Sequence, residues 1–235
     1  NLAGNLMQRS LTAWHKFFLI HSFYPLFLSS LMAISFLAFR FFYSGTYNYL
    51  NLMWNLFLAW MPYIFSVFAS YFYGHTPRRW WLISIFIALW LVFFPNAPYI
   101  VTDFYYLDPR PPIPLWFDIS LIAIFAFTGC FLAIASLRTI HLIIDKSLGK
   151  IIGWVFALFT LGLASLGVYL GRFGRYNSWD ILFDPRSLLK EIAGNLLNPL
   201  DNLGFLGFTI MFTSILLVFY LMFVTASTPY DASSS

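Results

Sequence analysis

LWFDISLIAIFAFTGCFLAIASL, residues 115–137, contains a single charged side chain, Asp118, close to its start. As a helix this stretch would extend about 34 Å at about 1.5 Å per residue, which is enough to cross a hydrocarbon core about 30 Å thick. Uncharged apolar stretches of this length are typical of helices that span a membrane. The stretch therefore predicts a transmembrane helix.

Five further apolar runs have the same character. They contain 20 to 23 residues each and lie at 17–39, 52–73, 80–99, 151–171 and 205–225. Across all six runs Asp118 is the only Asp, Glu, Lys or Arg. We predict an all-α polytopic membrane protein, a single domain over residues 1–235 with about six transmembrane helices and a polar tail at 226–235.

The composition of the whole chain agrees with this class. Hydrophobic residues make up 60% of the chain and charged residues 9%, whereas soluble domains carry about 25% charged residues. These values exclude a soluble globular enzyme and a disordered chain. The net charge of +4 is not gathered into a basic stripe, so we expect the lipid bilayer and no nucleic acid as a partner.

The third run is interrupted. Its uninterrupted part, residues 80–94, is about 22 Å long as a helix and stops short of a full crossing. Pro95 and Pro98 follow, and each removes a backbone donor and disfavours helix in the residue before it. Irregular backbone at membrane depth survives only where it is buried in protein or lines a wet cavity. We therefore expect an interrupted third helix close to a functional site.

Charges are distributed unevenly between the two sides of the predicted bundle. Lys and Arg in the short connections favour cytoplasmic termini, in a bacterial inner (cytoplasmic) or thylakoid-type membrane. Seven of the nine acidic residues fall on the outer side in this arrangement: Asp103, Asp108, Asp118, Asp180, Asp184, Glu191 and Asp201. Polar chemistry is thus concentrated on one face.

The connection after the fifth run is long enough to hold structure of its own. Asp184 followed by Pro185 is a helix-start signal. Apolar residues then recur at helical spacing, at Leu188, Leu189, Ile192 and Leu196. We predict a short amphipathic helix on the membrane surface before the sixth span.

Three stretches bring candidate site residues to the outer side. The candidate acids or bases are Asp103, Asp118 and Asp180. The candidate ligand- or anion-binding residues are Arg172, Arg175, Asn96, Asn177, Tyr99 and Trp179. If the fifth helix continues through Arg172 and Arg175, the two guanidinium groups share a face and can grip a carboxylate or phosphate. The same residues could instead form a structural network of ion pairs at the helix ends.

These stretches carry a resemblance to a known family. PNAPYIVTDF at 95–104, WFD at 116–118 and GRFGRYNSWD at 171–180 resemble the signature segments of a bacterial membrane-protein family, the domain of unknown function thirteen sixty-one. The resemblance extends over roughly residues 20–225. It implies a polytopic bacterial membrane protein and brings no established activity with it.

Weaker signals concern helix packing and metals. Gly167 and Gly171 lie four apart in the fifth run, and Gly129 and Ala133 in the fourth, which favours close helix packing inside the bundle. His141 and Asp145 also lie four apart, which we interpret as a solvated or interfacial pair, since two ligands are too few for a metal site. The sequence predicts no metal site and identifies no cofactor.

Three hypotheses for function remain open. The favoured one is an accessory, scaffold or assembly subunit of a larger bacterial membrane protein complex. The alternative is a membrane-embedded enzyme that acts on a lipid or anionic headgroup at the outer face through the Asp, Arg and Asn residues. The third is a transporter, for which the interrupted helix is the main argument.

Overall fold

The computed structural model describes residues 15–76, 79–176, 186, 190, 194 and 202–226. Six segments in this part of the chain are helical, long and apolar enough to cross a membrane, which confirms the all-α polytopic prediction. They are α2 (Phe23–Ser44), α3 (Asn51–His75), the segment Trp80–Tyr106, α6 (Leu115–Leu148), α7 (Lys150–Tyr169) with its continuation η2 (Leu170–Gly174), and α10 (Leu203–Ala226). The protein is therefore an integral membrane protein by the length and composition of its helices.

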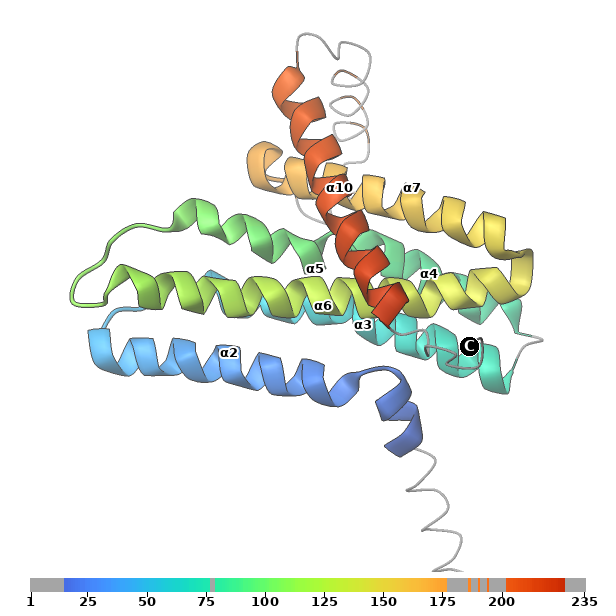
Figure 1. The fold of residues 1–235 in the computed structure, drawn as a ribbon, viewed down its shortest axis with the longest axis horizontal. Coiled ribbons are helices and arrows are strands. Elements are labelled where there is room, and N and C mark those ends of the chain that lie inside the picture. Colours follow the sequence, from blue (N-terminus) through green and yellow to red (C-terminus); the bar gives the residue numbers. More distant parts are fainter. Residues whose placement is uncertain are drawn as a thin grey trace, which may run out of the picture.

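Helix α6 is the centre of the bundle. It packs against α2, α3, α7, α10 and the end of the third span, and it is the most buried of the six segments. The small residues Ala126, Gly129 and Ala133 lie on its buried surface and allow neighbouring helices to approach closely. In Figure 1, α2, α3, α6 and α7 run along the long axis of the molecule, with the third span beside them.

Helix α10 is arranged differently. It crosses α6 and α7 instead of running alongside them, and its contacts are mainly with α7 (Figure 1). Only four of its residues are buried: Phe205, Phe212, Leu216 and Tyr220. Most of its apolar surface is therefore left for lipid.

The third span is interrupted at the two prolines, as predicted. Helix α4 (Trp80–Phe93) ends before Pro95, a short α5 (Asn96–Tyr99) follows, and a 3-10 helix, η1 (Ile100–Tyr106), completes the segment. The expectation that helix is disfavoured just before Pro95 is wrong, because Phe94 keeps helical angles (φ −55°, ψ −40°). The side-chain amide of Asn96 donates to the Phe93 carbonyl at 3.0 Å, so this carbonyl is satisfied despite the break.

Two glycines, one from each predicted motif, pack against the break in the third span, which confirms the predicted packing role of the motifs. Gly129 on α6 lies against the Ala97 carbonyl, so that a Cβ there would clash with backbone. An added Cβ at Gly167 on α7 would lie 2.9 Å from the Pro95 ring. The break in the third span is therefore enclosed between α6 and α7 at positions without side chains.

Two predicted helix boundaries are wrong. The first run, 17–39, is broken at His21 and Ser22, and Ser22 takes a left-handed conformation (φ 57°) before α2 begins. The fourth run, 115–137, continues as helix to Leu148, because ionised residues end an apolar run without ending a helix. Of the predicted amphipathic helix after Asp184 the structure describes only Arg186, Lys190 and Gly194, which are helical and exposed; the polar tail beyond Ala226 lies outside the described residues.

Candidate functional site

One end of the bundle holds a buried ion pair between Arg172 and Asp103. Nη2 of Arg172, on η2, donates to Oδ1 of Asp103, on η1, at 2.6 Å. Nε of Arg172 donates to the Thr102 hydroxyl at 2.7 Å. The other Asp103 oxygen accepts a 2.7 Å hydrogen bond from the side-chain amide of Asn55 on α3. Both oxygens of this carboxylate are therefore occupied, and three separate segments meet at it.

Two tyrosine rings contact the Arg172 guanidinium. Its central carbon lies 4.5 Å from the centre of the Tyr99 ring and 4.9 Å from that of Tyr106. Guanidinium groups are attracted to aromatic faces at such distances. The Tyr99 ring also packs against Gly171, where an added Cβ would lie 3.1 Å from it. The predicted site residues Asp103, Tyr99 and Arg172 are thus in one cluster.

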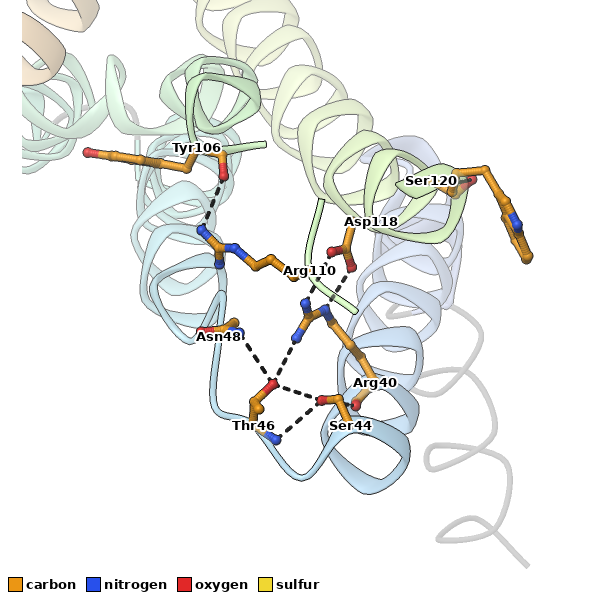
Figure 2. A network of polar contacts seen from close by, with 9 residues as sticks. Arg40, Ser44, Thr46, Asn48, Tyr106, Arg110, Asp118 and Ser120 are labelled. Carbon is orange, nitrogen blue, oxygen red and sulfur yellow. Dashed lines mark hydrogen bonds and ion pairs between the residues drawn. The ribbon is translucent and has the colours of Figure 1, made fainter. Parts of the chain in front are cut away.

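A second ion pair joins α2 to α6. Nε of Arg40 donates to Oδ1 of Asp118 at 2.7 Å, and Nη2 donates to Oδ2 at 3.1 Å, so the pair is bidentate (Figure 2). Both residues are fully buried. Nη1 of Arg40 also lies 3.5 Å from the Thr46 hydroxyl in the connection to α3. Asp118 therefore belongs to a separate cluster from Asp103.

The ring of Tyr49 lies between two guanidinium groups. The central carbons of Arg40 and Arg110 lie 4.8 and 4.7 Å from its centre. Arg110 also donates to the Tyr106 carbonyl at 3.4 Å (Figure 2). Burial raises the pKa of the Tyr49 hydroxyl and the Asp118 carboxylate raises it further, while the two guanidinium groups oppose the rise. Tyr49 is therefore protonated at neutral pH and can donate a hydrogen bond.

A cavity of about 360 Å³ lies beside the Arg172–Asp103 pair. This tyrosine–arginine pocket is lined by Tyr49, Asn51, Asn55, Tyr99, Asp103, Tyr106, Arg110 and Arg172. The lining holds two guanidinium groups and one carboxylate. Since Arg172 and Asp103 neutralise each other, and Arg110 forms no ion pair with a carboxylate among the described residues, the pocket carries one net positive charge.

A mostly apolar cavity of about 400 Å³ adjoins this pocket. Asn55 and Tyr99 line both cavities. The remaining lining of this proline groove comes from α3, from the third span around its break, and from α7, and includes Trp54, Leu58, Leu91, Pro95, Leu163 and Gly167. A charged pocket and an apolar groove thus lie next to each other, with two side chains common to both linings.

This arrangement is suited to binding an anion. A general base must lie within reach of the reacting proton. Asp118 is fully buried and lines none of the cavities, whereas Asp103 lines the pocket and accepts hydrogen bonds from Arg172 and Asn55. In the described part of the chain, no three His, Cys, Asp or Glu residues converge as a metal site would require.

Comparison with known proteins gives one match. A family described as a protein of unknown function, DUF1361, matches residues 54–219. The chain belongs to the DUF1361 family. The matched region is shorter than the expected 20–225, but it contains all three motifs and both Asp103 and Asp118. No curated protein and no solved structure matches the chain.

The condition for a joint grip of Arg172 and Arg175 on an anion, a helix that continues through both residues, is not met in this DUF1361 chain. The helix ends at Gly174, and Arg175 adopts a left-handed conformation (φ 60°, ψ 26°) that takes it off the helical path. Arg175 is exposed, whereas Arg172 is buried against Asp103.

The other predicted site residues have mixed outcomes. Asn96 lines the proline groove and not the tyrosine–arginine pocket. The candidates Asn177, Trp179 and Asp180 lie outside the described residues.

Sequence reasoning missed several residues of the two clusters. Arg40 was expected in a connection, but it lies inside α2 and neutralises Asp118. The sequence does indicate that Asp118 has a basic partner, because a lone carboxylate in an apolar span requires one. Asn55 is an isolated amide in the second run, and such polar side chains in spans often face the bundle interior. Nothing in the pattern indicates Tyr49 or Arg110.

His141 and Asp145 lie at the opposite end of the bundle. Nε2 of His141 is 3.2 Å from Oδ1 of Asp145. His141 is buried, and its other ring nitrogen is hydrogen-bonded to the Tyr220 hydroxyl on α10. The interpretation as a solvated or interfacial pair is therefore wrong for His141, because α10 covers its ring.

Proposed function

We propose that this DUF1361 protein binds an anionic amphiphile. The charged headgroup would occupy the tyrosine–arginine pocket and the hydrocarbon chain would occupy the proline groove. The observation that supports the proposal is the adjacency of the two cavities, which share Asn55 and Tyr99 and differ in the chemistry of their linings. A molecule with one charged and one apolar end matches both linings at once.

Arg110 is the residue on which headgroup recognition would depend. Its guanidinium forms no ion pair with a described carboxylate, and stacking on Tyr49 holds its position. Guanidinium groups donate in a planar fork that fits the oxygens of phosphate and carboxylate groups. Arg172 contributes less net charge, because Asp103 neutralises it.

The proposal places the site on the outer face of a bacterial inner (cytoplasmic) or thylakoid-type membrane, with cytoplasmic termini. It is supported by the Lys and Arg residues of the short connections and by the acidic residues gathered on the other side. A lipid of the outer leaflet would then reach the groove from within the bilayer.

The other hypotheses stay predictions. An enzyme acting on the bound lipid would have to use Asp103, which lines the pocket beside Arg172, because Asp118 is fully buried and lines no cavity. An accessory subunit would use exposed apolar faces such as that of α10, but lipid contact requires the same faces. Transport would need the enclosed break in the third span to open.

Arg110→Gln tests the proposal directly. Trp54 lines the groove, so the fluorescence difference between wild type and Trp54→Phe isolates its signal from that of the other tryptophans. In detergent, phosphatidylglycerol with brominated chains should quench this signal, and Arg110→Gln should weaken the apparent affinity about tenfold, or about 1.4 kcal/mol. Folding should be unaffected, because Arg110 is half-exposed in a connection.

Arg79→Gln is the matched control. It removes the same charge from an exposed arginine at the other end of the bundle and should titrate like wild type. Equal quenching by brominated phosphatidylcholine, or an Arg110→Gln titration that matches wild type, would contradict the proposal.

A further inference from the structure

A separate cavity lies at the opposite end of the bundle from the tyrosine–arginine pocket. It has a volume of about 210 Å³ and lies among the chain preceding α2, the last turns of α3 and α6, and α10. Its lining combines apolar side chains with a polar set made up of His21, Ser22, Ser70, Tyr73, Arg138, Thr139 and Lys146. We refer to this cavity as the His21 pocket.

The break before α2 forms one wall of the His21 pocket. Ser22 is left-handed at φ 57°, and the His21 carbonyl accepts a 2.9 Å hydrogen bond from the Tyr63 hydroxyl. Nδ1 of His21 lies 2.9 Å from the Phe17 carbonyl and therefore donates to it, while Nε2 lies 3.2 Å from the Ser70 hydroxyl. These contacts fix the break against α3, so the cavity is part of the fold.

The charge of the pocket is positive. Its lining contains Arg138 and Lys146 and no Asp or Glu. Neither cation forms an ion pair with a carboxylate among the described residues. The acid nearest to Lys146 along α6 is Asp145, which lies beside His141 at 3.2 Å. Two cations therefore line a small cavity whose own lining contains no carboxylate.

We propose that the His21 pocket binds the phosphate of an anionic phospholipid headgroup. The arginine and lysine supply charge and donors for phosphate oxygens, and the Tyr73 hydroxyl adds a neutral donor. Basic pockets between transmembrane helices are suited to anionic headgroups of the leaflet they face. The antiparallel helices place this pocket at the leaflet opposite to the tyrosine–arginine pocket, so the inference does not depend on the proposed function.

Counting bound lipids by native mass spectrometry tests the proposal. Wild-type protein titrated with dioleoyl phosphatidylglycerol should retain a lipid at this site. Lys146→Gln should weaken the affinity for this lipid about tenfold, and Arg138→Gln should weaken it by at least as much. Lys146 is exposed, so its replacement should leave folding intact even if Arg138→Gln impairs it. The variants Lys146→Gln and Arg110→Gln, made singly and together, separate the two sites. Loss of one bound lipid in the single variant Lys146→Gln supports the His21 pocket, whether or not Arg110→Gln also loses a lipid.

Two controls make the result decisive. Arg79→Gln, at the same end but outside the lining, should bind like wild type. Inorganic phosphate in millimolar excess should not displace the lipid, because it lacks the apolar part. Unchanged lipid retention in Lys146→Gln, an equal loss in Arg79→Gln, or displacement by inorganic phosphate alone would overturn the assignment.

Discussion

The Arg40–Asp118 and Arg172–Asp103 pairs have the same chemistry and different surroundings. Arg40 and Asp118 are joined by two hydrogen bonds, are fully buried between α2 and α6, and line none of the cavities described above. Arg172 and Asp103 are joined by one hydrogen bond and border the tyrosine–arginine pocket. The first pair therefore connects helices, whereas the second can also respond to a ligand.

The difference shows why an ion pair in a membrane bundle is not by itself a site. A buried pair is costly to break, because the remaining charge stays unpaired in a medium of low dielectric constant. A pair beside a cavity leaves room for water or a ligand to compensate. Substitutions in the two pairs should therefore differ in both size and kind of effect.

The largest loss of stability is expected from Asp118→Asn. It leaves the Arg40 guanidinium buried without a counter-charge and should lower the free energy of unfolding by about 3–5 kcal/mol. Thermal unfolding in detergent measures the loss. The double variant Arg40→Met with Asp118→Leu should recover most of it, because the charge is removed together with its partner. A wild-type melting curve for Asp118→Asn would show that the pair does not hold the helices.

Asp103→Asn is expected to cause a smaller loss of stability and, at the same time, to strengthen lipid binding. Arg172 keeps its hydrogen bond to Thr102 and its contacts with two rings, so the cost in unfolding free energy should be about 1–3 kcal/mol. The net charge of the pocket rises from one to two, so phosphatidylglycerol should quench Trp54 at lower concentration. Weaker binding in a folded Asp103→Asn protein would refute the electrostatic argument.

The smallest effect is expected from Gly171→Ala. The new methyl group would lie 3.1 Å from the Tyr99 ring, which can shift, so the overpacking cost is partly offset by better helix propensity and the net loss should be about 1 kcal/mol. Because Tyr99 lines both cavities, lipid affinity should fall a few-fold while the melting temperature changes little. Gly162→Ala, which has open space on the same helix, is the control and should leave binding unchanged.

The helical architecture could be predicted because the apolar runs of membrane spans are local features. Each run is visible without knowledge of its neighbours, and the interruption follows from Pro95 and Pro98 alone. The boundaries were less predictable, since α6 continues for eleven residues beyond Leu137, the last residue of the uncharged run. Hydropathy indicates which residues lie in lipid, but it does not show where a helix ends, because a helix can extend beyond the membrane into water.

The site was only partly predictable, because its contacts join residues far apart in the chain. Asp103, Tyr99 and Arg172 were placed at one end by counting spans, and they do meet. The partner of Asp118 lies 78 residues away at Arg40, and Arg175 leaves the predicted face through a change in backbone angle. Neither the packing of α2 on α6 nor that angle is encoded in residue spacing.

The spacing of two charged residues along α6 can be compared with the thickness of the hydrocarbon core of a membrane. Asp118 and Arg138 lie twenty residues apart on this single helix, which corresponds to about 30 Å of rise and to the thickness of a typical hydrocarbon core. Asp118 is neutralised by Arg40 inside the bundle, so a thicker bilayer would draw mainly the Arg138 charge toward hydrocarbon, and a thinner one would expose apolar surface between the two positions. Hydrophobic mismatch of this kind sorts proteins among membranes, so we expect α6 to favour bilayers of ordinary thickness.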